Sequence, residues 1–154
     1  MSRGDVRIVN TKGVREKALE GAKIVYEAVS AGYGPTSGNV ALEKSYGSYV
    51  ISHDGVSIAR DIVLRDKQQD IGADLLIQAS KKSNDISGDG TTCSILLGYH
   101  IMTKANQAIV AGYNPMAVRR GITQAGELIK AKLDAISTPV KDEDLADVAT
   151  ISAG

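Results

Sequence analysis

The segment SGDGTTC, residues 87–93, contains two glycines, one aspartate and two threonines. Glycine and paired threonines lower helix stability, yet the segment lies between two long stretches with helical periodicity. Asp89 is placed to be the N-cap of the second helix, which leaves the amides of Gly90, Thr91 and Thr92 as unpaired donors of its first turn. These amides, the helix dipole and the threonine hydroxyls predict a site for a phosphate group.

A carboxylate inside this segment implies a metal ion. Asp89 repels a phosphate directly, because both groups are negative. A Mg²⁺ ion between them removes the conflict, since Mg²⁺ takes carboxylate and phosphate oxygens together. The alternative is that Asp89 only caps the helix and the glycines form a plain loop. A Walker A loop is absent, because no lysine follows the glycines.

Two other turns carry residues that suit the same chemistry. Gly34 and Pro35 follow a long helical stretch and can form a second backbone cradle, although a plain helix C-cap explains them too. At the second turn, Asp54 is able to orient a water or reach a metal, and His53 is able to meet a phosphate. The alternative there is a tight turn with positive φ, which Asp54-Gly55 favours.

The elements that must position these turns are mostly helices. Apolar residues at spacings of three and four predict helices over about 11–30, 66–86, the stretch from 94 to 110, and a fourth after Asn114-Pro115, with a short amphipathic piece over 142–150. Strands at 40–42 and 49–51, joined by a turn at 45–48, predict one hairpin, and Ser57 is placed to cap a short helix after it. The residues expected on the inner sides of the second and third helices are Ile71, Leu75, Leu76 and Ala79, and Ile95, Leu96, Tyr99, Met102 and Ile109. The first and fourth helices each carry one apolar stripe, formed by Val14, Ala18, Ala22, Val25 and Val29, and by Val118, Ile122, Ala125, Ile129 and Leu133.

Composition narrows the class of protein. The chain has 154 residues with 18 basic and 18 acidic side chains, so it lacks the basic excess of a nucleic-acid-binding protein. No apolar run approaches the roughly 20 residues of a membrane span, and the N-terminus has no secretory signal. Cys93 is the single cysteine, which excludes an intrachain disulfide and fits a reducing compartment. We therefore expect a cytoplasmic protein that binds neither nucleic acid nor membrane.

Several motifs in register resemble the chaperonins of the bacterial GroEL type. GDGTT at 88–92 is similar to that family's phosphate-binding signature, and DGVSIAR at 54–60 to its DGVSVAR stretch. AGYNPM at 111–116 resembles AGMNPM, and ATISA at 149–153 resembles GTISA. Three positions depart from the family pattern: His53 stands where lysine is common, Gly32 where the family has a threonine, and Cys93 at the third threonine of GDGTTT.

The resemblance implies a fold, a cofactor and a domain plan. It implies a mainly α, multihelical equatorial-domain-like fold with one small β-hairpin, where residues 1–136 are the N-terminal part of the ATP-binding equatorial domain and 137–154 begin the intermediate segment. Asp89 would bind Mg²⁺ and Asp54 would be the catalytic carboxylate near the γ-phosphate and the attacking water. The residues implied to bind ATP are Gly34, Pro35, His53, Gly90, Thr91, Thr92, Ile151 and Ser152.

Three hypotheses about function follow. The first is the ATP-binding portion of a chaperonin that assists protein folding through ATP-driven changes of a subunit ring, with unfolded substrates and a co-chaperonin bound only by the absent apical domain. The family's water-activating aspartate lies beyond Gly154, so this portion is expected to hydrolyse little or no ATP. The second is a truncated equatorial piece that acts only as a structural or self-association module. The third, an unrelated phosphotransferase, lacks both a P-loop lysine and a catalytic base constellation.

Overall fold

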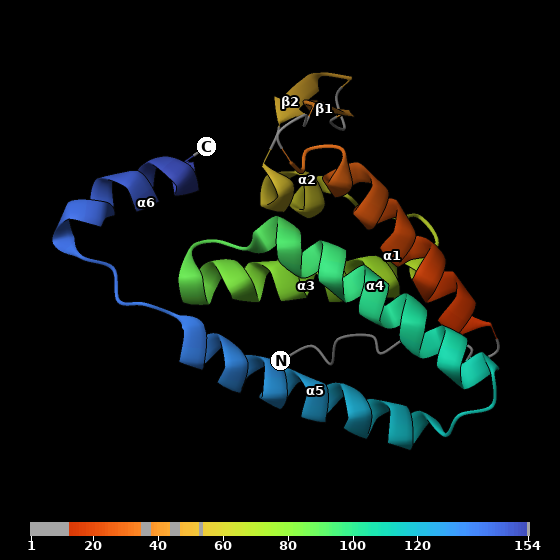
Figure 1. Ribbon diagram of the computed structural model, residues 1–154. Helices are drawn as coiled ribbons and strands as arrows, with labels where there is room; N and C mark the ends of the chain where they lie inside the picture. The colour runs from red at the N-terminus through yellow and green to blue at the C-terminus, as the bar shows by residue number, and fades with distance from the viewer. Residues whose placement is uncertain (1–12, 35–37, 44–46, 53, 154) are drawn as a thin grey trace, which may run out of the picture. The chain divides into compact units, whose positions relative to one another are not determined.

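The computed structural model describes residues 13–34, 38–43, 47–52 and 54–153. The chain divides into two units, residues 1–103 and 104–154. The elements of the first unit are α1 (Val14–Ser30), β1 (Val40–Glu43), β2 (Tyr49–Ser52), α2 (Gly55–Asp61), α3 (Lys67–Ser87) and the start of α4 (Thr91–Val110). The second unit contains the end of α4, α5 (Pro115–Ile136), the 3₁₀ turn η1 (Asp142–Asp144) and α6 (Leu145–Ala153) (Figure 1). The predicted mainly helical fold with one hairpin is confirmed.

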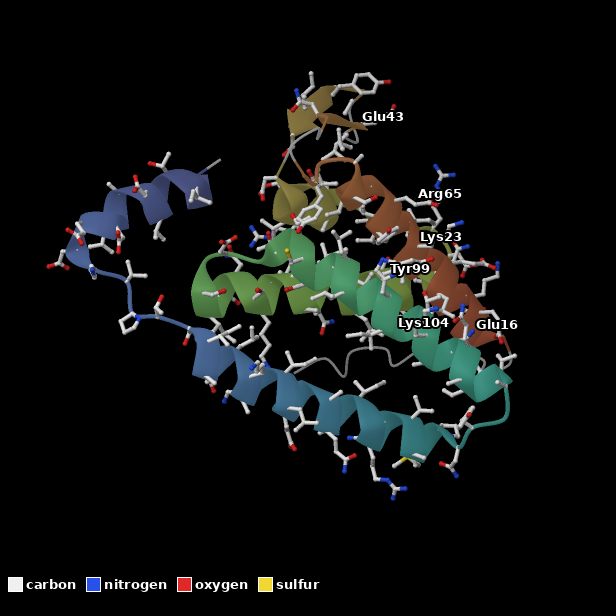
Figure 2. All side chains as sticks on the ribbon, viewed as in Figure 1. Glu16, Lys23, Glu43, Arg65, Tyr99 and Lys104 are labelled. Carbon is white, nitrogen blue, oxygen red and sulfur yellow. The ribbon has the colours of Figure 1, made fainter. Side chains whose placement is uncertain are left out.

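The core of the first unit is built from small and branched aliphatic side chains on four helices. The rings of Tyr26 on α1 and Tyr99 on α4 stack with centroids 4.4 Å apart; Tyr99 is labelled in Figure 2. Because the chain has neither Phe nor Trp, the helices must approach closely to fill this core. The fully or almost fully buried members are Ala22, Val25, Val29, Ile58, Ala59, Ala73, Leu76, Ile77 and Ile95.

Two glycines set the distance between α1 and α3. A Cβ on Gly21 would lie 1.9 Å from the carbonyl oxygen of Gln69, and a Cβ on Gly72 would lie 1.7 Å from that of Ala18. No side chain fits at either point, so the two helix backbones touch there. As a result, α1 and α3 pack more closely than any other pair of described helices in the first unit.

The crossing also corrects the predicted buried face of α3. Ile71 and Leu75 were expected inside but are 38% and 53% exposed, and Ala79 is exposed as well. Since Gly72 must face α1, the helix is rotated so that Ala73, Ile77 and Ser80 are buried together with Leu76, whose burial was predicted. Periodicity alone predicted the helix but not its rotation, because both stripes contain apolar residues.

The hairpin is a short antiparallel pair that leads into α2. Val40 pairs with Ser52 and Glu43 with Tyr49. Part of the predicted turn, residues 45 and 46, lies outside the described residues, whereas Gly47 is described and has φ +73°. The strand β2 ends at Ser52, and α2 begins three residues later at Gly55.

The helices that lie wholly in the second unit, α5 and α6, have mostly exposed side chains. Asn114 caps α5, its Oδ1 accepting from the amides of Met116 and Ala117 at 2.8 and 3.3 Å, with Pro115 at the first helical position as predicted. No residue of α5 is buried. In the described part of the chain, no helix combines the length and apolar character that crossing a membrane requires.

Candidate phosphate-binding site

Two left-handed glycines explain the composition of the segment 87–93. Gly88 ends α3 with φ +69° and donates its amide to the carbonyl of Asn84 at 2.8 Å, while Gly90 has φ +72°. Residues with a Cβ adopt this conformation only at a cost, whereas glycine adopts it freely. The glycines are therefore required to turn the chain from α3 into α4 within three residues.

Serine hydroxyls hold this turn from the side of α3. Ser83 Oγ and Ser87 Oγ both donate to the carbonyl oxygen of Asp89, at 2.9 and 3.0 Å. The two serines are four residues apart, so they lie on one face of the helix. The backbone of Asp89 is thus fixed while its side chain stays exposed.

The start of α4 corrects the predicted cap. The first amide bonded in the helical manner is that of Ser94, which donates to the carbonyl of Gly90 at 2.9 Å, so Gly90 and not Asp89 occupies the N-cap position. The left-handed φ of Gly90 starts the helix one residue later than predicted. Asp89 Oδ1 accepts instead from the adjacent amide of Gly90 at 2.6 Å.

This shift changes which amides are available to an anion. The amide of Gly90 already donates to Asp89. Within the described residues, the amides of Thr91, Thr92 and Cys93 donate to no acceptor. These three are the unpaired donors that a helix N-terminus directs at a ligand.

Asp54 is the N-cap of α2, the position for which Ser57 was predicted. Its Oδ1 accepts from the amide of Val56 at 3.4 Å, and its Oδ2 accepts from the amide and the hydroxyl of Ser57 at 3.0 and 2.6 Å. The predicted positive-φ turn at Asp54-Gly55 is wrong, because Asp54 has φ −78° and Gly55 is already helical. The capping carboxylate takes the place of that turn by satisfying the first amides of the helix.

The electrostatics of Asp54 follow from this cap. Partial burial raises the pKa of the carboxyl group, but the hydrogen bonds from Ser57 and Val56 and the charge of Arg60 outweigh it and lower the pKa below its ordinary value of 3.8. Asp54 is therefore ionised at neutral pH. An ionised carboxylate is the form that accepts a proton or binds a cation.

Gly55 brings this cap against the first turn of α4. A Cβ on Gly55 would lie 2.2 Å from Thr92 Oγ1 and 3.1 Å from Val29 Cγ1. The absence of a side chain is thus required by packing and not by backbone angle. It allows the N-termini of α2 and α4 to meet.

The turn after α1 reaches the same place. The Tyr33 hydroxyl lies 3.4 Å from Cys93 Sγ. This hydrogen bond raises the pKa of Tyr33, because the contact favours the neutral phenol. Gly34 follows directly with φ +96° and is exposed. Three segments far apart in the sequence therefore meet at the N-terminus of α4.

Four other residues were predicted to bind nucleotide: Pro35, His53, Ile151 and Ser152. Pro35 and His53 lie outside the described residues. Ile151 and Ser152 lie in α6 of the second unit, where Ile151 is 82% exposed. Their predicted contacts with nucleotide stay predictions.

Comparison with known proteins decides the family. Residues 25–154 match the TCP-1/cpn60 chaperonin family. The chain belongs to this chaperonin family. It is 43% identical over 143 residues to the chaperonin GroEL of Acholeplasma laidlawii, an alignment that covers 92% of this chain and 27% of that relative. The predicted resemblance is confirmed, and the chain spans about a quarter of its relative's length.

The donor set of this chaperonin chain fits a metal ion shared with a ligand. No group of three or more His, Cys, Asp and Glu side chains within the described residues could hold a metal alone. Asp89 offers one exposed carboxylate, and Mg²⁺ keeps near-octahedral coordination with several waters or phosphate oxygens. Asp89 would thus supply one position and phosphate and water the others.

Three residues that contribute to the turn of this chaperonin chain were not predicted from the sequence. Ser83 and Ser87 had a usable signal, since their spacing of four places both hydroxyls beside the loop at the end of a helix. Tyr33 had none, because its contact with Cys93 joins positions 60 residues apart.

Proposed function

We propose that this chain is the nucleotide-binding portion of a chaperonin subunit and that the N-terminus of α4 holds the phosphates of Mg-ATP. The observation that carries the proposal is the convergence of three turns on one helix end with unpaired amides. Each turn contributes a different kind of group: amide donors from α4, a capping carboxylate from α2 and a left-handed glycine from the turn after α1.

The roles follow from the chemistry of each group. The amides of Thr91, Thr92 and Cys93 donate to phosphate oxygens, and the threonine hydroxyls add further donors. Asp89 binds the Mg²⁺ ion, which neutralises phosphate charge when it is bound. Gly34 lets the backbone approach the nucleotide closely.

Asp54 has the position and charge for an orienting role. Its carboxylate is ionised, partly exposed and fixed by Ser57, next to the helix end that Gly55 places against Thr92. The three protein hydrogen bonds leave acceptor capacity on Oδ1, since a carboxylate has about four lone-pair sites and two of the three bonds go to Oδ2. We therefore propose that the Asp54 carboxylate orients a water near the terminal phosphate.

Titration calorimetry with Mg-ATP tests the proposal. Asp89→Asn keeps an oxygen that accepts from the Gly90 amide but removes the charge, so affinity should fall at least about tenfold, the lower end of what even a supporting residue of a metal site contributes. Asp85→Asn removes the same charge from the exposed end of α3 and should leave affinity within about twofold. Equal affinity of wild type and Asp89→Asn would refute the assignment.

Hydrolysis is expected to be slow or absent for this chain alone. Phosphoryl transfer depends on a positioned water as well as on charge compensation, and the family resemblance places one water-activating aspartate beyond Gly154. A phosphate-release assay should therefore show little turnover while calorimetry shows binding. Steady turnover by the pure chain would contradict this part of the proposal.

A second candidate function, self-association, is favoured by the surface of the second unit. One face of α5 carries large apolar side chains that are 41–60% exposed: Ile122, Ile129, Leu133 and Ile136. Large apolar patches promote association. Size-exclusion chromatography with light scattering distinguishes a monomer, which favours nucleotide binding as the main role, from concentration-dependent oligomers.

For the whole protein we propose the wider role of the family. It is an ATP-driven folding assistant in the cytoplasm, built as a ring of subunits, and it binds unfolded proteins and a co-chaperonin through segments outside this chain. Assistance of refolding of a denatured enzyme by the full-length protein, with and without Mg-ATP, tests this role.

A further inference from the structure

Tyr33 links the turn after α1 to the proposed phosphate-binding turn. Its hydroxyl and Cys93 Sγ are 3.4 Å apart, although the residues are 60 positions apart in the sequence. Such a distance fits a hydrogen bond to sulfur, in which either group can donate.

The backbone of this turn is anchored at its other side. The amide of Gly32 donates to the carbonyl of Val29 at 3.1 Å, and the amide of Tyr33 donates to that of Ser30 at 3.2 Å. Tyr33 is therefore held on the end of α1 by its backbone and on α4 by its side chain. The next residue is Gly34, so the side-chain contact fixes where Gly34 stands relative to the amides of α4.

We propose that Tyr33 is a positioning residue of the nucleotide site, whose hydroxyl contact with Cys93 holds the Gly34 turn against the first turn of α4. The inference rests on the function proposed above and adds a residue to it. Tyr33 is 53% exposed, so its ring is only half covered by protein. Removing the hydroxyl alone, as in Tyr33→Phe, therefore changes the contact and little of the packing.

Cys93 provides a direct reporter of this contact. It is the single cysteine and it is exposed, so iodoacetamide alkylates one position of the chain. Tyr33→Phe should raise the alkylation rate of the free chain about threefold, in keeping with the loss of one neutral hydrogen bond. Tyr113→Phe, which alters an exposed tyrosine after the other end of α4, should leave the rate unchanged.

Nucleotide affinity then tests the positioning role with a double-mutant cycle. Tyr33→Phe and Cys93→Ala should each weaken Mg-ATP binding about threefold. Cys93→Ala keeps the backbone amide that faces phosphate, so it removes only the partner of Tyr33. If the two side chains act as one contact, the double variant should also be about threefold weaker and not ninefold.

The outcomes separate this inference from the proposed function. The positioning role is supported by four results together. The wild-type chain binds Mg-ATP, and the nucleotide protects Cys93 from alkylation. The double-mutant cycle is non-additive, and the variants keep the wild-type melting temperature. Wild-type binding with additive effects, or with no effect of Tyr33→Phe on alkylation or affinity, overturns it and leaves the proposed function standing. A wild-type chain that neither binds Mg-ATP nor is protected by it overturns both.

Discussion

Replacing Gly55 by alanine adds one methyl group at the point where α2 meets α4. The new Cβ would lie 2.2 Å from Thr92 Oγ1, 3.2 Å from Thr92 Cβ and 3.1 Å from Val29 Cγ1. Thr92 can relieve the shortest of these contacts by changing χ1, because threonine has two accessible rotamers in a helix. The other two contacts remain, so the helix ends must also move apart slightly.

The expected loss of stability can be bounded from two opposing effects. Alanine in place of a helical glycine stabilises by about 1 kcal/mol through propensity. An extra methyl group in a filled space costs about 1–3 kcal/mol. Gly126→Ala in α5 serves as the matched control, because a Cβ there meets no atom within 4 Å and only the propensity gain applies. The free energy of unfolding of Gly55→Ala should thus be about 1–3 kcal/mol lower than that of Gly126→Ala, when each is compared with wild type.

The effect on nucleotide binding provides a second measurement. If Thr92 rotates, the hydroxyl that we propose as a phosphate donor changes its orientation, so Mg-ATP affinity should fall about threefold to tenfold, the contribution of one hydrogen bond. Urea unfolding followed by circular dichroism and calorimetry with Mg-ATP supply the two quantities. In a Thr92→Ala background the nearest clashing atom is gone, and Gly55→Ala should cost less stability there than in wild type.

One result would refute this reasoning. If Gly55→Ala stabilises the chain as Gly126→Ala does, in the wild-type and Thr92→Ala backgrounds alike, then α2 does not pack on the first turn of α4 and the three turns do not converge.

Three further perturbations test other parts of the structure. Gly72→Ala places a Cβ 1.7 Å from the Ala18 carbonyl oxygen, which no rotamer change relieves, so thermal melting should show a loss of at least about 3 kcal/mol; a near-neutral result would contradict the helix crossing. The lowered pKa of Asp54 contributes stability that is fully present above its unfolded-state pKa of about 3.9 and is lost as the pH falls through the lower folded-state pKa; melting temperatures between pH 7 and pH 2 should therefore fall less steeply for Asp54→Asn. Asn114→Ala removes the acceptor of two amides at the start of α5 and should cost about 1 kcal/mol, with an unchanged melting curve counting against the cap.

The local elements were predictable because their signals are local. Helix spacing, the Asn114-Pro115 start and the glycine ends gave the helix bounds to within a few residues. The anion site at the segment 87–93 was also inferred from residue types near a helix start, and it stays a prediction. Three local details were wrong: the caps at Asp89 and Ser57 and the positive-φ turn at Asp54-Gly55. A left-handed Gly90 takes the first cap position, and a capping Asp54 replaces both the second cap and the turn.

The sequence by itself determined the helices, the hairpin, the family and the candidate phosphate turn, because each rests on neighbours in the chain or on motifs in order. Tertiary structure decided the rotation of α3 and the meeting of three turns at α4. The first depends on the backbone contact at Gly21 and Gly72, and the second on Gly55 against Thr92 and Tyr33 against Cys93. These contacts join residues far apart in the sequence, so their fit depends on how whole helices pack and leaves no periodic trace in the residues themselves.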